Sequence, residues 1–113
     1  MSRVIPFRPA DNNYRLSISV DGSVVLFDVR WNSLPAGGWF LDLREQDESP
    51  IDLGIKIVLG VNLGRRSTHP FFRTYLLRAF DTSGVGADPG YDELGRRVIV
   101  KLFTVDEILE QLP

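Results

Sequence analysis

The chain has 113 residues, of which 43% are hydrophobic and 25% charged, and it carries a net charge of −2, no cysteine and one histidine. This composition is typical of one globular domain, and it excludes disulfides, thiol catalysis, thiolate metal sites and zinc sites built on paired histidines. The negative charge argues against a dedicated nucleic-acid binder, whose surface would be basic, so we expect no direct nucleic-acid binding.

The N-terminal segment, residues 1–13, contains two prolines and has no hydrophobic period. It predicts an extended arm ahead of a single β-rich domain, residues 14–113. The first residues are basic but no apolar stretch follows them, so we expect no signal peptide and a location in the cytosol of the cell that makes the protein. No run approaches the roughly 20 apolar residues that span a bilayer, so we also expect no membrane partner.

Alternating apolar and polar side chains predict six strands, each with its hydrophobic positions on one face. The first two flank Asp21-Gly22, a dipeptide suited to the positive φ angles of a two-residue hairpin turn. In the fourth, Gly54 indicates a β-bulge or the close approach of another backbone, and Leu53 is expected on the apolar face with its neighbours Ile51 and Ile55. The predicted strands cover residues 14–20, 23–31, 39–45, 51–60, 74–81 and 96–103.

Two segments depart from the strand pattern. Residues 61–73 have no clear period and predict an irregular segment with one helical turn. Thr104 and Glu107 have the spacing of a capping box, and the apolar residues that follow predict a C-terminal helix over residues 105–112. The whole pattern predicts an all-β, mainly antiparallel fold: a small barrel or sandwich of about six strands with a short C-terminal helix.

The glycine-rich loop 81–95 is the strongest candidate for a metal or catalytic carboxylate site. An EF-hand needs an oxygen ligand at its fifth position and a Glu at its twelfth, but counting from Asp81 these positions hold Val85 and Asp92. Asp, Pro and Gly are also the residues that tight turns require, so we expect no metal and no cofactor. Ion binding by the loop stays open, as does a hydrolase that would use Asp81, Asp88, Asp92 or Glu93.

The exit of this loop carries opposite charges at close spacing. Glu93 precedes Arg96 and Arg97 by three and four residues. We expect an ion pair between Glu93 and one of these arginines, which would fix the loop where it enters the last strand.

Two other groupings are weaker signals of chemistry. Ser67 and His69 lie close enough for a nucleophile and a base, but their loop position favours a structural role. The pair Arg65-Arg66 followed by Phe71-Phe72 could bind single-stranded nucleic acid by stacking and phosphate contacts. Because the chain is acidic, we favour the interpretation that the two phenylalanines anchor a long loop to the core.

Aromatic and other apolar residues around the second hairpin allow three interpretations. Leu34 and Pro35 at the loop tip could contact a partner protein, whereas Trp39 alternates with Leu41 and Leu43 and is expected in the core. A small β-barrel module could instead bind a ligand or carbohydrate in a mouth lined by Tyr14, Trp31 or Trp39.

Three motifs in order resemble a known family. They are the hairpin VRWNSLPAGGWFLDLRE, the glycine-punctuated IDLGIKIVLGVNLGRR, and the loop and strand DTSG…DPGYDELGRRVIVKLF. Together they resemble the small baseplate-plug family of contractile-tailed phages, described for a cyanophage baseplate and also found in prophages. The likeness covers residues 14–103, nearly the whole domain. The residues that match the family motifs are Arg30, Trp31, Asn32, Trp39, Phe40, Leu41, Asp42, Leu43, Asp92, Glu93, Leu94, Gly95, Arg96 and Arg97.

The resemblance implies a structural protein of the virion with no enzymatic activity, no cofactor and no catalytic residues. Such a protein would be made in the host cytoplasm, lie in the tail baseplate of the virion, and plug or bridge the central hub region through contacts with hub or spike proteins. Self-association into a homo-oligomer stays open. An extended arm and long irregular loops are compatible with this role, because arms of this kind bind grooves and strand edges on neighbours.

Overall fold

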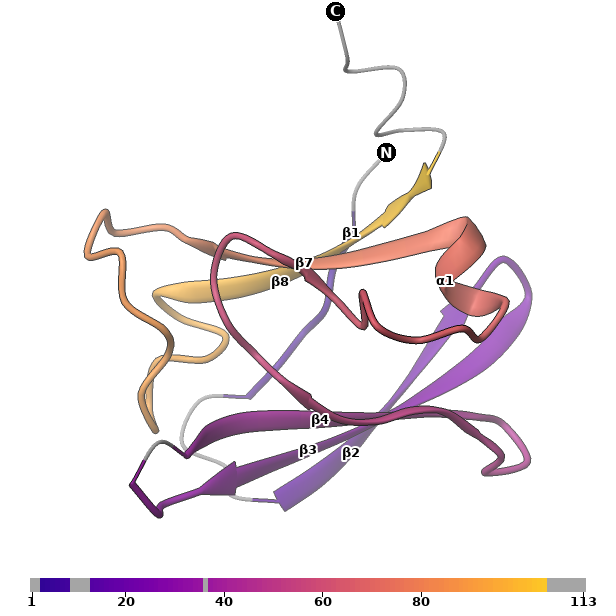
Figure 1. Cartoon of the computed structure of the whole chain (residues 1–113), viewed down its shortest axis with the longest axis horizontal. Coiled ribbons are helices and arrows are strands. Elements are labelled where there is room, and N and C mark those ends of the chain that lie inside the picture. Colours follow the sequence, from indigo (N-terminus) through magenta and orange to yellow (C-terminus); the bar gives the residue numbers. More distant parts are fainter. Residues whose placement is uncertain (1–2, 9–12, 36, 106–113) are drawn as a thin grey trace, which may run out of the picture.

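The computed structural model describes residues 3–8, 13–35 and 37–105 (Figure 1). The fold is mainly antiparallel β, as the alternation predicts, and each of the six predicted strands has a counterpart. Two short strands, β1 and β6, add to them. The elements in chain order are β1 Arg3–Val4, β2 Asn13–Val20, β3 Ser23–Asn32, β4 Gly38–Glu45, β5 Pro50–Lys56, β6 Asn62–Leu63, α1 Phe71–Thr74, β7 Tyr75–Asp81 and β8 Val98–Thr104.

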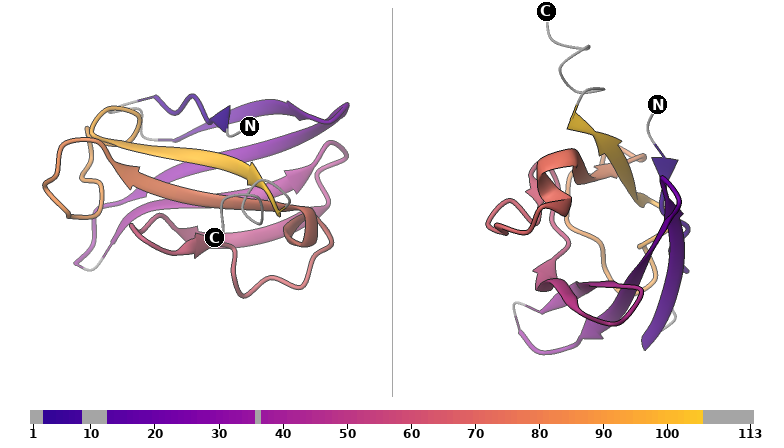
Figure 2. Two further views of the ribbon diagram at one scale, coloured as in Figure 1. Left: turned by 90° about the horizontal axis from the view of Figure 1, so that it is seen from above. Right: turned by 90° about the vertical axis from the view of Figure 1, so that its right-hand side faces the viewer.

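The strands form two four-stranded sheets on opposite sides of the core (Figures 1 and 2). The first, here called the meander sheet, has the order β2-β3-β4-β5, and the second, here called the terminal sheet, has the order β1-β8-β7-β6. The predicted turn between β2 and β3 is confirmed, since Asp21 and Gly22 have φ angles of 50° and 83°. The meander sheet therefore follows from local sequence, whereas the terminal sheet pairs segments from both ends of the chain.

Residues 57–59 carry the chain from one sheet to the other. The N–H of Ile57 donates to the carbonyl of Trp39 in β4 at 2.9 Å. Two residues later, Leu59 forms a bridge with Ala79 in β7. One short segment thus hydrogen-bonds to both sheets and fixes their separation at this edge.

The core lies between the sheets and takes side chains from both. Trp39 is fully buried, which confirms its predicted core position. Ile5 and Phe7, which follow β1 in the N-terminal segment, are only 1% and 5% exposed. Among the described residues no polar or charged side chain is buried. The largest fully buried side chains are those of Trp39, Phe27, Ile5, Leu41, Leu43, Ile57, Leu63, Leu77 and Leu94.

Gly54 lies in a β-bulge, one of the two alternatives that the sequence left open. The register shifts between Leu41 and Leu43 of β4, so that Leu53 and Gly54 together face the single residue Asp42. Gly54 has φ 72°, and no neighbouring atom would contact a side chain placed there, so close approach of another backbone is not the reason for the glycine. The extra residue breaks the alternation. Leu53 is 49% exposed, and its predicted place on the buried face was wrong.

The irregular segment contains the single helical turn that its sequence predicts, α1. Phe71 and Phe72 pack against the core, which agrees with their predicted anchoring role. The helix predicted over residues 105–112 lies outside the described residues, apart from Val105. Within the described ranges no helix is long and apolar enough to cross a membrane.

Candidate interaction surface

Arg97 organises the loop between β7 and β8. Its Nε and Nη2 donate to the two carboxylate oxygens of Glu93 at 2.7 and 3.0 Å. Its Nη1 and Nη2 donate to the carbonyls of Ala87 and Asp88 at 2.8 and 3.1 Å, and Nη1 also lies 3.2 Å from Asp81 Oδ2. A guanidinium has five N–H donors, and five contacts surround this one, so a lysine ammonium could not replace it.

Two carboxylates fix the ends of the loop. The hydrogen bonds from Arg97 are the main cause that lowers the pKa of Glu93. Backbone N–H groups of Gly86 and Ser83 donate to Asp81 and hold the pKa of that carboxyl well below its usual range. Both groups are therefore charged at neutral pH. The predicted ion pair of Glu93 is confirmed, and its partner is Arg97.

Trp39 connects this loop to the meander sheet. Its indole Nε1 donates to the carbonyl of Gly90 at 2.9 Å, and the N–H of Gly90 donates to Glu93 Oε1 at 2.7 Å. Its ring stacks on Tyr91, with centroids 6.1 Å apart and planes 9° apart. The hairpin motif and the loop motif, which are distant in the sequence, therefore meet at one end of the molecule.

The loop between β7 and β8 approaches the β3–β4 turn at this end (Figure 1, left), and both segments carry exposed apolar side chains. Tyr91 is 40% exposed, and its ring meets that of Trp31 edge to face at 5.6 Å. Leu34 at the turn is 69% exposed, and Val85 on the loop is 65% exposed. Exposed hydrophobic side chains of this size favour contact with another protein. We call the region formed by the β3–β4 turn and the facing part of the loop the loop end, defined by Trp31, Leu34 and Tyr91.

The polar half of the hairpin motif lies on the outer face of the meander sheet. Asp42 lies 3.1 Å from Arg30 and accepts the N–H of Gly54 at 2.7 Å. Burial raises the pKa of Asp42, but the hydrogen bonds from Arg30 and Gly54 outweigh it, so the pKa falls below its ordinary value. Asp28 lies directly opposite Asp42 in the register, and Asp28 in turn forms an ion pair with Arg15 at 2.6 Å. Arginines thus offset a repulsion between facing carboxylates.

Both motifs thus contribute to one structure. A protein-family model described as cyanophage baseplate Pam3 plug gp18 matches residues 2–107. The chain belongs to this family. The resemblance seen in the sequence is confirmed, and membership supports a structural role in a phage tail baseplate, in contact with other baseplate proteins. No curated protein matches the chain.

In this baseplate-plug chain the carboxylates of the acidic loop stabilise its fold. Turn chemistry accounts for Asp81, which caps its own turn. Asp88 instead accepts the N–H of Leu59 at 2.9 Å, a long-range contact that the sequence did not indicate. Asp92 is exposed. Within the described part of the chain no group of three or more His, Cys, Asp or Glu side chains is placed to hold a metal ion.

The Ser67 and His69 pair is part of a loop, as the sequence favours. The backbone N–H of His69 donates to Ser67 Oγ at 3.2 Å, and His69 Nδ1 accepts the N–H of Phe71 at 3.0 Å. The imidazole nitrogen that could act as a base is thereby used to begin α1. The two side chains are connected through backbone groups, which gives the serine no activating partner within the pair.

Two grooves lie away from the aromatic residues proposed for a ligand site. One, of about 670 Å³, lies between the β2–β3 turn, the β4–β5 turn and α1. The other, of about 410 Å³, runs along β5 beside the loop at Arg65. Neither groove is lined by Tyr14, Trp31 or Trp39. The family-motif tryptophans thus serve the core and the loop end in the described structure.

Proposed function

We propose that this chain is a non-enzymatic component of a contractile, phage-like tail baseplate that plugs or bridges the central hub region. In this proposal it is made in the host cytoplasm, assembled into the virion, and bound to hub or spike proteins. The observation that carries the proposal is the family match over residues 2–107. The organisation of the loop supports it, because the charged side chains there hold backbone in place and leave apolar side chains facing outward.

The loop end supports a contact role on physical grounds. A small protein that fills a space between larger proteins has to keep its conformation when force acts on it. Trp39 links the loop to the meander sheet, while Arg97 links it to Asp81 at the end of β7 in the terminal sheet. A loop fixed to both sheets loses little conformational freedom on binding, which favours affinity.

Co-expression with each tail protein encoded beside the gene tests the proposal. We expect the full chain to co-elute with a hub or spike protein in size-exclusion chromatography, and to be detected by mass spectrometry in purified tails. Leu34→Ser should weaken the complex, whereas Leu53→Ser, which changes an exposed leucine in the β5 bulge, should not. If the chain binds none of these proteins and is absent from purified tails, the proposed function is wrong.

A further inference from the structure

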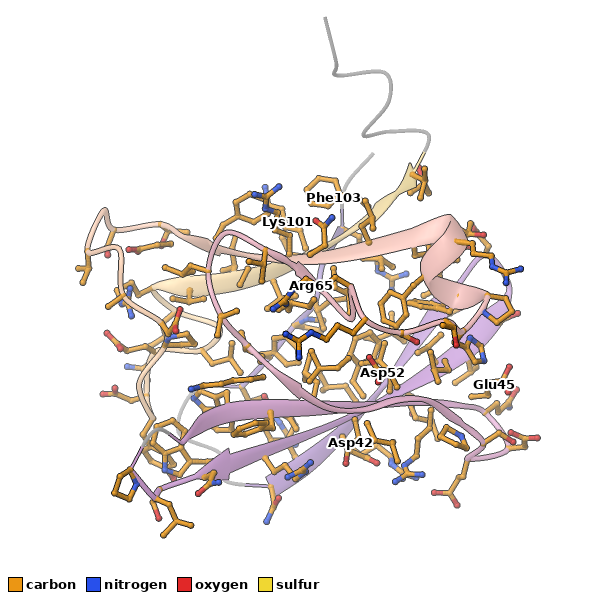
Figure 3. The ribbon with its side chains drawn as sticks, in the orientation of Figure 1. Asp42, Glu45, Asp52, Arg65, Lys101 and Phe103 are labelled. Atoms are coloured by element: carbon orange, nitrogen blue, oxygen red, sulfur yellow. The ribbon has the colours of Figure 1, made fainter. Side chains whose placement is uncertain are left out.

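The outer face of the terminal sheet is apolar, although an antiparallel face in contact with water is ordinarily polar. Leu77 and Ala79 of β7 and Val100 and Leu102 of β8 are buried, so the alternate side chains point away from the core. Figure 3 shows two of these side chains, Lys101 and Phe103, on the outer side of the ribbon. The outward set consists of Leu76, Arg78, Phe80, Ile99, Lys101 and Phe103, with Val4 of β1 beside Lys101 and the exposed, polar Asn62 of β6 beside Arg78.

These side chains form one continuous patch. In the strand register Phe80 faces Ile99, and Lys101 faces Val4, which is 49% exposed. The rings of Phe80 and Phe103 lie 6.0 Å apart, and Phe103 is only 9% exposed, so the accessible apolar surface comes from Phe80, Ile99, Leu76 and Val4. Lys101 Nζ lies 5.4 Å from the Phe80 ring, so its charge sits against apolar surface. We call this patch the terminal face.

The outer face of the meander sheet differs in kind. Its charges are paired across strands, with Arg15 and Arg44 lying 2.6 and 3.2 Å from Asp28. Arg30 pairs with Asp42, which Figure 3 shows on the opposite side of the molecule from Lys101. The terminal face has two cations and no carboxylate among its outward side chains. The carboxylates Asp28 and Asp42 on the meander sheet are thus offset by arginines of the same face, whereas the terminal face presents apolar surface with positive charge that no carboxylate of that face balances.

We propose that the terminal face is a second docking surface, which binds a neighbouring baseplate protein through an apolar surface bordered by Asp and Glu side chains. This inference rests on the proposed function. The chemistry of the occupant follows from the patch: apolar area to cover Phe80 and Ile99, and carboxylates to meet Arg78 and Lys101. With the loop end, the chain then has two separate contact surfaces. Two surfaces allow it to bridge two neighbours.

The test uses the full chain and the neighbouring tail protein that co-elutes with it. Ile99→Thr and Lys101→Glu each change the terminal face while keeping residues compatible with a strand surface. Val24→Thr, a half-buried β-branched residue on the outer side of the meander sheet, and Arg73→Glu, an exposed arginine of α1, are the matched controls. We expect about a tenfold rise in Kd for each terminal-face variant, with a larger effect of Lys101→Glu at low salt, and about a twofold change or less for the controls.

The outcomes separate the two proposals. If the wild-type chain binds no tail protein, both are wrong. If it binds and the terminal-face variants bind equally well, the proposed function stands and the second surface is wrong. Loss of a wild-type homo-oligomer in Ile99→Thr, seen by light scattering, would make a second copy the occupant and overturn the inference. Melting temperatures that fall in both terminal-face variants while binding is unchanged would assign the patch to the chain's own residues 106–113, whose sequence is also apolar and acidic, and would overturn it too.

Discussion

A Trp39→Phe substitution tests whether the indole N–H supports the loop, because phenylalanine keeps an aromatic ring on β4 but has no donor. The carbonyl of Gly90 loses its hydrogen bond, which costs about 1 kcal/mol. Trp39 is fully buried, and the smaller ring leaves roughly 40 Å³ unfilled, which costs about 1 kcal/mol more. Weaker stacking on Tyr91 adds about 0.5 kcal/mol. We expect the free energy of unfolding to fall by about 2–3 kcal/mol.

Urea denaturation followed by far-ultraviolet circular dichroism measures this loss without relying on tryptophan emission, and the slope of the transition should not change. Trp31→Phe is the matched control. Trp31 is only half-buried, so we expect its substitution to cost less than about 1 kcal/mol. In Trp39→Phe, the amides of Arg96 and Val98, which donate to the Glu93 carbonyl, should also exchange hydrogen faster. Equal losses in the two variants, or unchanged amide exchange, would refute the role assigned to the indole.

Three further predictions concern the loop. Glu93→Gln should lower the melting temperature by roughly 2–6 °C at neutral pH. Because Arg97 lowers the pKa of Glu93 in the folded state, this difference from wild type should shrink as the pH falls through that folded-state pKa. A difference in melting temperature that does not depend on pH would contradict the ion pair. Gly95→Ala should lower the free energy of unfolding by about 2–4 kcal/mol, since φ is 87° and the new Cβ would collide with the carbonyl of Phe7. Gly84→Ala, where φ is 82° and the space is open, should lower it by only about 1–2 kcal/mol. Equal urea midpoints for the two variants would refute the collision. Thermal melts in chelator and in about 1 mM calcium should coincide, and a higher melting temperature in calcium would show that the acidic loop binds the ion.

The meander sheet could be predicted because its information is local. Alternation places each strand, and Asp21-Gly22 specifies the turn between the first two. The failure at Leu53 has a local cause as well, since the register of β5 shifts twice and takes Leu53 out of the alternation, while Ile51 and Ile55 on either side of it stay buried. The terminal sheet contains pairings that periodicity does not encode. Nothing in the sequence near Val4 indicates that Lys101 lies opposite it.

At the loop end, too, the short-range features could be predicted and the long-range contacts could not. The short-range pair of Glu93 and Arg97 could be predicted from spacing, and the burial of Trp39 from alternation. The stacking of Trp39 on Tyr91 was missed because it depends on where a long loop returns. One signal was available: a buried indole N–H requires an acceptor. A backbone carbonyl in the facing loop, where a glycine stands beside an aromatic residue, is a reasonable candidate for that acceptor.

The pairing of β1 with β8 has a consequence for how the chain acquires its fold. Arg3 lies opposite Leu102, so the two ends of the polypeptide close one sheet. Closing so long a span has a high entropic cost, whereas β2 to β5 need only short turns. We expect the meander sheet to become protected first in pulsed hydrogen exchange, and the terminal sheet to follow. On a ribosome, the last step would wait until residue 104 leaves the exit tunnel, so Ile5 and Phe7 would remain uncovered until then.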